Sequence, residues 1–182
     1  MKTIALFGGS FDPPHIGHEA IVKAVLNLKN IDKVVVMPTF LNPFKLKSHA
    51  SSKLRLKWLK DIFSSYKNVE IDSYEVDLNK KTPSIQSVRY LLKKYKKIYL
   101  IIGADNLKSL PKWYKYKELK ELVTFVVASR DNIGIPIDFL ALHIDEDTSS
   151  SKLRNFMDIS KLSKKCAIEI SKHYKETNAN KN

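Results

Sequence analysis

Four short, almost unbroken apolar runs constrain the fold of this chain more than any other feature of its sequence. They are TIALF at residues 3–7, KVVVMP at 33–38, KIYLIIG at 97–103 and VTFVVAS at 123–129. Strands that read as continuous apolar runs are buried on both faces, as they are in a parallel sheet. Apolar residues with helical spacing lie between the runs, at residues 16–28, 54–63 and 84–95. This alternation predicts an α/β fold with a doubly wound parallel sheet and helices on both faces.

The rest of the chain carries weaker signals. Residues 69–77 (VEIDSYEVD) alternate and predict a strand or a pair of strands, and residues 139–145 predict a weaker strand. Helical segments are expected near 150–157 and at 161–174, the second with one apolar face made of Leu162, Cys166, Ile170 and Tyr174. We expect a single domain over residues 1–182, with a C-terminal helical part at about 149–175 and a frayed tail at 176–182.

The formal net charge of +13 raises the question of a nucleic-acid partner. Only four of the 32 basic residues are Arg, and the Lys residues are scattered along the chain. We therefore interpret the charge as a solvated, Lys-rich surface, which would also attract small polyphosphates. The single cysteine excludes an internal disulfide, and no signal peptide or run of about 20 apolar residues is present. These features predict a cytoplasmic protein with neither a membrane span nor a nucleic-acid ligand.

The segment GGSFDPPHIGH, residues 8–18, directly follows the first predicted strand. Gly8 and Gly9 allow a ligand to approach the backbone closely, and the helix that starts near His15 directs its free N–H groups toward the strand ends. His15 and His18 are three residues apart and can face the same anion, with Gly17 leaving room between them. In a sheet of this kind, ligands bind at the carboxyl ends of the strands. The segment therefore predicts a phosphate site.

A second candidate phosphate site is TSSSKLR, residues 148–154. Three serines, Ser149, Ser150 and Ser151, precede a predicted helix, and Arg154 lies on its first turn. Hydroxyl groups, a helix N-terminus and a guanidinium are all suited to binding an anion.

Together these segments resemble the nucleotidylyltransferases. GGSFDPPHIGH resembles their (H/T)xGH motif, which the class I aminoacyl-tRNA synthetases share, and TSSSKLR resembles the ISSTxxR motif of the small adenylyltransferases. KLSKK at 161–165 is similar to the synthetase KMSKS loop, but 182 residues leave no room for tRNA-binding domains. The resemblance implies a Rossmann-like fold, with His15, His18 and Arg154 as catalytic residues. It implies an ATP site formed by Gly8, Gly9, Ser10, Phe11, His15, Gly17, His18, Gly103, Asp105, Ser149, Ser150, Ser151 and Arg154.

The middle of the chain resembles the bacterial nicotinate-mononucleotide adenylyltransferases. The matching segments are IIGADNLKSLPKWYKYKEL at 101–119, TPSIQSVRYLL at 82–92 and PTFLNPFK at 38–45. The resemblance implies that Asp105 contacts ribose and that Trp113 stacks on the pyridine ring, although a half-buried tryptophan alone would suggest a core position. It implies a pyridine-nucleotide site formed by Lys45, Thr82, Ser84, Trp113 and Asp105. Ile85 replaces the family's usual Tyr. Lys45 and Asn42 are candidate phosphate ligands, Arg55 is a further candidate, and Arg130 matches the family's RPG segment only in part.

The implied reaction transfers the adenylyl group of ATP to nicotinate mononucleotide, giving nicotinate adenine dinucleotide (deamido-NAD) and pyrophosphate. The acceptor phosphate is already ionised, so no general base is required. Mg²⁺ is expected to arrive on ATP rather than on protein side chains, and Asp12 is interpreted first as a turn residue. Nicotinamide mononucleotide or pantetheine phosphate as acceptor stays an alternative, as does a non-catalytic nucleic-acid-binding protein. The sequence leaves open whether the chain is a monomer or a homo-oligomer.

Overall fold

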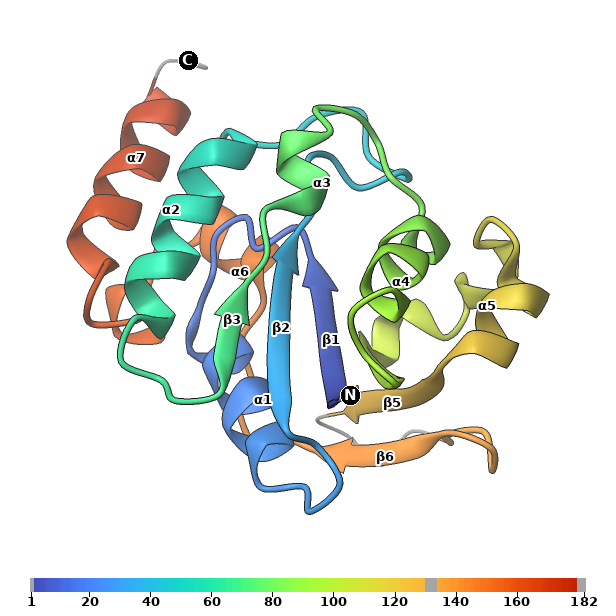
Figure 1. Cartoon of the computed structure of the whole chain (residues 1–182). Helices are drawn as coiled ribbons and strands as arrows, with labels where there is room; N and C mark the ends of the chain where they lie inside the picture. Colours follow the sequence, from blue (N-terminus) through green and yellow to red (C-terminus); the bar gives the residue numbers. More distant parts are fainter. Residues whose placement is uncertain (1, 130–133, 180–182) are drawn as a thin grey trace.

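The computed structural model describes residues 2–129 and 134–179, and its described strands form one sheet (Figure 1). The strands are all parallel, in the order β3-β2-β1-β4-β5-β6. Their bounds are β1 Thr3–Gly9, β2 Lys33–Pro38, β3 Val69–Ile71, β4 Lys97–Gly103, β5 Thr124–Ser129 and β6 Leu140–His143. The prediction of a parallel α/β sheet is confirmed, and each of the four apolar runs forms a strand.

The strand order changes direction at β1, which pairs with β2 on one side and with β4 on the other. Phe7 of β1 lies opposite Val36 of β2 and Ile101 of β4. The chain leaves β1 toward one edge of the sheet and later returns to build the other. Such a switch point opens a crevice at the carboxyl ends of the strands.

Helices cover both faces of the sheet, as predicted (Figure 1). Helices α1 (Ile16–Leu26), α2 (Ser52–Phe63), α6 (Ser150–Asn155) and α7 (Ala167–Ala179) contribute to one core, around Trp58 and Tyr174. Helices α4 (Ser84–Leu92) and α5 (Tyr116–Leu122) contribute to the other core. Alternate residues of β1 enter the two cores, because successive strand side chains point to opposite faces. None of the helices within the described ranges is long and apolar enough to cross a bilayer.

Residues 69–77 differ from the prediction of a strand or strand pair. Pairing of β3 ends where the Asp72 N–H donates to the carbonyl of Val36. The Asp72 carboxylate then accepts the N–H of Tyr74 at 2.8 Å and turns the chain into the short helix α3, Tyr74–Asp77. A local side-chain bond of this kind competes with strand pairing and overrides the alternating pattern.

The C-terminal part also differs in detail. The predicted helix over 161–174 is instead a 3₁₀ turn, η3 (Ile159–Lys161), an irregular stretch, and then α7. The four apolar residues predicted to share a face are all buried. Helix α7 continues through residues 176–179, so that part of the predicted frayed tail is helical, while residues 180–182 lie outside the described ranges.

Candidate active site

A cleft of about 1560 Å³ opens at the carboxyl edge of the sheet. It is larger than the roughly 300–1,000 Å³ of a typical ligand pocket and has room for two nucleotides. Every residue of the predicted ATP and pyridine-nucleotide sites lines it. These are Gly8, Gly9, Ser10, Phe11, His15, Gly17, His18, Lys45, Thr82, Ser84, Gly103, Asp105, Trp113, Ser149, Ser150, Ser151 and Arg154. Segments from both ends of the chain therefore meet in one cleft, which is a geometric requirement of the predicted site.

The two histidines of the first motif take different positions at the start of α1. His15 is the buried N-cap residue, and its ring stacks on that of His18 with centroids 3.7 Å apart. The Nδ1 atom of His18 accepts a hydrogen bond from the His15 backbone N–H at 3.1 Å. A ring nitrogen that accepts carries no proton, so Nε2 of a neutral His18 is the donor. Nε2 is thus the atom suited to a phosphate oxygen.

Side chains pack closely around Phe11 and Gly17 in this motif. Phe11 has a left-handed φ of 48° and lies buried with its ring against Phe7 and His18. Only its backbone is therefore suited to contact ATP. A Cβ on Gly17 would lie 3.0 Å from Nδ1 of His15 and 3.3 Å from the methyl group of Thr148. A side chain at residue 17 would therefore crowd these two residues, while Gly17 itself lines the cleft.

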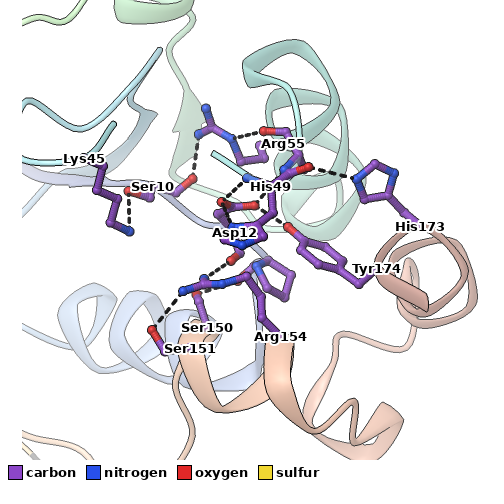
Figure 2. A network of polar contacts seen from close by, with 12 residues as sticks. Ser10, Asp12, Lys45, His49, Arg55, Ser150, Ser151, Arg154, His173 and Tyr174 are labelled. Carbon is purple, nitrogen blue, oxygen red and sulfur yellow. Dashed lines mark hydrogen bonds and ion pairs between the residues drawn. The ribbon is translucent and has the colours of Figure 1, made fainter. Parts of the chain in front are cut away.

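The second motif is tied directly to the first (Figure 2). Arg154 donates to the backbone carbonyl of Asp12 and, at 2.9 Å, to Oγ of Ser151. Ser150 donates to the Pro13 carbonyl at 2.8 Å, and Ser149 caps α6 by accepting the Lys152 N–H. Arg154 has five N–H donors, and these bonds use two of them. The motif therefore positions the first loop and retains donors for an anion.

Asp12 is an anchor of the loop rather than a simple turn residue (Figure 2). Its buried carboxylate accepts the backbone N–H groups of His49 and Ala50, at 2.8 and 3.0 Å, and the hydroxyl of Tyr174. Burial alone would raise the pKa of the Asp12 carboxyl. The hydrogen bonds, led by that of Tyr174, together with the Arg55 charge outweigh burial and lower the pKa below its ordinary value. Asp12 is therefore an internal carboxylate, fixed by helix α7.

The prediction that Arg55 contacts a substrate is wrong. Its side chain is 1% exposed, and its guanidinium donates to the carbonyls of Ala50, Ser10 and Phe40 at 3.1, 2.6 and 2.8 Å. Burial, the largest effect, lowers the pKa of Arg55, and the charge of Asp12 opposes it. Arg55 joins the loops that follow β1 and β2 from behind the cleft.

Lys45 and Asn42 lie on the loop that follows β2. The Nζ atom of Lys45 lies 3.4 Å from Oγ of Ser10, within the cleft. Burial of the amino group and the nearby charge of Arg154 lower the pKa of Lys45. Asn42 closes a turn by accepting the Phe44 N–H at 2.9 Å. Lys45 and Arg154 thus repel each other across a site where a polyanion would relieve the repulsion.

The strand-end Gly103 allows the following carboxylate to turn back toward the cleft. A Cβ on Gly103 would lie 2.4 Å from Oδ1 of Asp105, which any larger residue would displace. Trp113, after the 3₁₀ turn η2 (Leu110–Lys112), is half-buried in the cleft wall. Asp105 and Trp113 both line the cleft, and their contacts with a substrate stay predictions.

The TPS segment leads into α4 at the same cleft. Thr82 is buried, and its hydroxyl donates to the Lys80 carbonyl at 3.1 Å, so it stabilises a turn. Ser84 is the first residue of α4, whose initial N–H groups have no partner within the helix. Ile85, where the family usually has Tyr, is buried in the core beneath this helix.

Among the cleft residues that sequence reasoning missed, Thr39 and Glu75 have buried polar side-chain atoms. Each has a buried side-chain oxygen, Oγ1 and Oε2, with no hydrogen-bond partner within residues 2–129 and 134–179. Thr39 follows β2 directly, so the rule that ligands bind at strand ends could have found it. Glu75 carried no such signal, because it lay in a segment interpreted as strand.

Arg130, the partly matching candidate after β5, lies outside the described residues. Among the residues that are described, no three His, Cys, Asp or Glu side chains come together as a metal site.

The structure places a parallel sheet and two candidate phosphate-binding segments at its switch point. The chain belongs to the cytidylyltransferase-like family of nucleotide-binding enzymes, because the family model matches residues 6–156. Within this family it belongs to the nicotinate-nucleotide adenylyltransferases. It is 60% identical to a probable nicotinate-nucleotide adenylyltransferase of Sulfurimonas denitrificans over 97% of both chains. It is 50% identical to one of Campylobacter fetus over 97% of this chain and 99% of the relative.

The fold is also shared with solved structures. The nicotinic acid mononucleotide adenylyltransferase of Plasmodium falciparum, solved as a complex with NaAD, aligns over 100% of both chains with a TM-score of 0.79. Its sequence identity to this chain is 20%, so this likeness shows the common fold alone.

Proposed function

We propose that this cleft joins Mg–ATP and nicotinate mononucleotide, yielding nicotinate adenine dinucleotide and pyrophosphate in NAD biosynthesis. The observation that carries the proposal is the convergence of two helix N-termini, those of α1 and α6, on one cleft that Lys45 and Arg154 also line. Helix N-termini and cations bind polyphosphates. The family of the chain indicates which adenylyl transfer this arrangement serves.

The chemistry follows from the placement of these groups. A phosphate oxygen of the mononucleotide attacks the α-phosphorus of ATP, a new P–O bond forms, and the bond to the leaving pyrophosphate breaks. Negative charge grows on the bridging and leaving oxygens. Nε2 of His18 and the cationic groups of Lys45 and Arg154 are proposed to stabilise that charge. His15 holds the His18 ring in place, and the ionised acceptor needs no general base.

The second half of the cleft is proposed to hold the pyridine mononucleotide. Trp113 offers a flat aromatic surface, and the first turn of α4 at Ser84 offers N–H donors for a carboxylate. Asp105 supplies an acceptor for ribose hydroxyl groups. Thr82 contributes by holding the turn that leads into α4.

The test of the function is pyrophosphate release from Mg–ATP with different acceptors. Nicotinate mononucleotide, nicotinamide mononucleotide and pantetheine phosphate are compared at equal concentration. We expect the highest kcat/KM with nicotinate mononucleotide. Release that is faster with either other acceptor would contradict the proposed substrate, and no release with any acceptor would contradict the proposed enzyme.

The role of His18 is tested by the variants His18→Ala and His18→Asn. We expect kcat to fall about 100-fold or more in both, because each removes the Nε2 donor. Asn can still accept the His15 N–H, so it separates the cap of α1 from the contact with phosphate. His143→Ala is the matched control, because His143 is exposed on β6. Near-normal turnover of His18→Asn would remove His18 from the mechanism.

We also infer that Mg²⁺ enters with ATP, since Mg²⁺ is commonly held by substrate phosphates and water. A cytoplasmic location is supported by the lone cysteine, Cys166, which is free and buried. Nicotinate mononucleotide and ATP are the proposed partners of the site.

A further inference from the structure

The cleft contains a buried carboxyl group that the proposed mechanism does not use. Glu75, in helix α3, is 5% exposed and lines the cleft. Its Oε1 accepts a hydrogen bond of 2.6 Å from the hydroxyl of Ser87 in α4. Its Oε2 has no partner within the part of the chain that the structure describes. Leaving a buried polar atom without a partner is costly, which suggests that a ligand supplies the missing contact.

The bond to Ser87 places this carboxyl group beside the proposed pyridine site. Ser84 and Ser87 are three residues apart on α4, so they lie on the same face of the helix, one turn apart. Through Ser87, the Glu75 carboxyl group is therefore bound to the same face of α4 as Ser84, one turn further along the helix. Trp113, in the cleft wall, has a buried Nε1 that also lacks a partner among the described residues. The pyridine ring is assigned to Trp113 and to the first turn of α4. Trp113 itself carries a buried polar atom without a described partner, and Glu75, bonded to α4, carries another.

We propose that Glu75 is a specificity-determining residue whose protonated carboxyl group donates a hydrogen bond from Oε2 to the carboxylate of the nicotinate ring. When it is protonated, Glu75 selects nicotinate mononucleotide over nicotinamide mononucleotide. The inference rests on the proposed function, and it adds a residue and a protonation state to it.

The surroundings of Glu75 favour the protonated form. Burial, the dominant effect, raises the pKa of Glu75 to about 7, while the bond from Ser87 lowers it and the negative charge of Asp72 raises it further. A neutral carboxyl group donates a strong, charge-assisted hydrogen bond to a carboxylate. An ionised Glu75 would repel the same carboxylate. The carboxamide of nicotinamide can donate or accept, so its binding depends much less on the charge of Glu75.

Other charged groups near α3 are engaged elsewhere. Helix α3 also packs against β2 and α2. Lys33 of β2 pairs with Glu70 at 2.7 Å, and Arg55 of α2 donates to three carbonyls. The remaining charged residues of α2 are exposed, and Arg89 of α4 is exposed and paired with Glu118. Asp72, whose own pKa is raised by burial, is therefore the charge that bears on Glu75.

The experiment measures kcat/KM for nicotinate and for nicotinamide mononucleotide between about pH 6 and pH 8.5, and reports their ratio. Both substrates carry the same ribose phosphate, so its ionisation cancels in the ratio. We expect the ratio to fall by up to roughly 30-fold across this range as Glu75 ionises with a pKa of about 7. Glu75→Gln keeps a donor at every pH, so its ratio should be independent of pH.

Asp77→Asn is the matched control, because Asp77 is an exposed carboxylate of the same helix. It should keep the pH dependence of the wild type. A flat ratio in the wild type would overturn the proposal even if Glu75→Gln did not fold. A Glu75→Gln ratio that falls as in the wild type would also overturn it. Absence of turnover with both mononucleotides at every pH would instead overturn the proposed function itself.

Discussion

The buried carboxyl group of Glu75 should make the stability of this chain fall as pH rises. Its pKa is about 7 in the folded chain, against an ordinary value of 4.5. Between these two values the folded chain holds a proton that the unfolded chain has released. The folded state then binds more protons, so the free energy of unfolding decreases as pH rises through this window.

The difference between the two pKa values sets the size of the effect. A shift of one pKa unit corresponds to about 1.4 kcal/mol, so the difference of roughly 2.5 units corresponds to about 3 kcal/mol. This full loss is reached above pH 7, where Glu75 is ionised in both states. Because single domains are stable by only about 5–15 kcal/mol, the loss would be easy to measure.

Urea unfolding at about pH 5 and pH 8 measures the effect in the wild type, in Glu75→Gln and in Glu121→Gln. The last is a control, because Glu121 is an exposed carboxylate of α5. Burial also raises the pKa of Asp72, and this contribution acts in the same direction in all three proteins. We expect the wild type and the control to lose about 2.5 kcal/mol more than Glu75→Gln over this range, because part of the full effect is already lost below pH 5. Equal losses in all three proteins would refute the argument that burial keeps Glu75 protonated.

Three further substitutions test the surroundings of the site. Arg55→Met should lower the free energy of unfolding by about 3–5 kcal/mol, since it leaves three carbonyls without their donor and removes the positive charge near the Asp12 carboxylate; an unchanged urea midpoint would contradict this. Tyr174→Phe should cost about 1–3 kcal/mol by removing a donor to the buried Asp12 carboxylate, and normal stability would exclude that bond. Trp113→Ala should raise KM for the pyridine mononucleotide more than for ATP in steady-state kinetics; equal changes would indicate a core role.

The sheet could be predicted because its strands carry their own signal. The apolar runs at 33–38 and 97–103 coincide with β2 and β4, since burial on both faces leaves little choice of residue. The segment 69–77 was predicted correctly as a strand only at Val69–Ile71, because the Asp72 side chain ends the strand by accepting the N–H of Tyr74. An alternating sequence pattern indicates which side chains are buried. It does not reveal that a side chain such as that of Asp72 can bind a nearby backbone N–H and so end the strand.

The residues of the site were predictable to the extent that they follow strands or start helices. All of them line one cleft, while their individual roles stay predictions. The roles of Arg55 and Asp12 could not be inferred from sequence, because a buried charge that binds backbone groups has the same residue type as one that binds a substrate. Glu75 was missed for a related reason, since its proposed role follows from burial beside α4, which only the tertiary structure brings about.

Helix α7 lies beyond residues 6–156, which the family model matches, yet it is linked to the first loop of the site (Figure 2). Tyr174 of α7 donates to the Asp12 carboxylate, and Nε2 of His173 lies 3.4 Å from the His49 carbonyl, on the segment that Asp12 also binds. These contacts join residues more than a hundred positions apart, so the loop after β1 reaches its described arrangement only when the last helix is in place. Because Arg154 binds the same loop through the Asp12 carbonyl, the loop is held from two sides by the end of the chain. The geometry around His18 therefore depends on packing of α7, a helix that itself contributes no residue to the lining of the cleft.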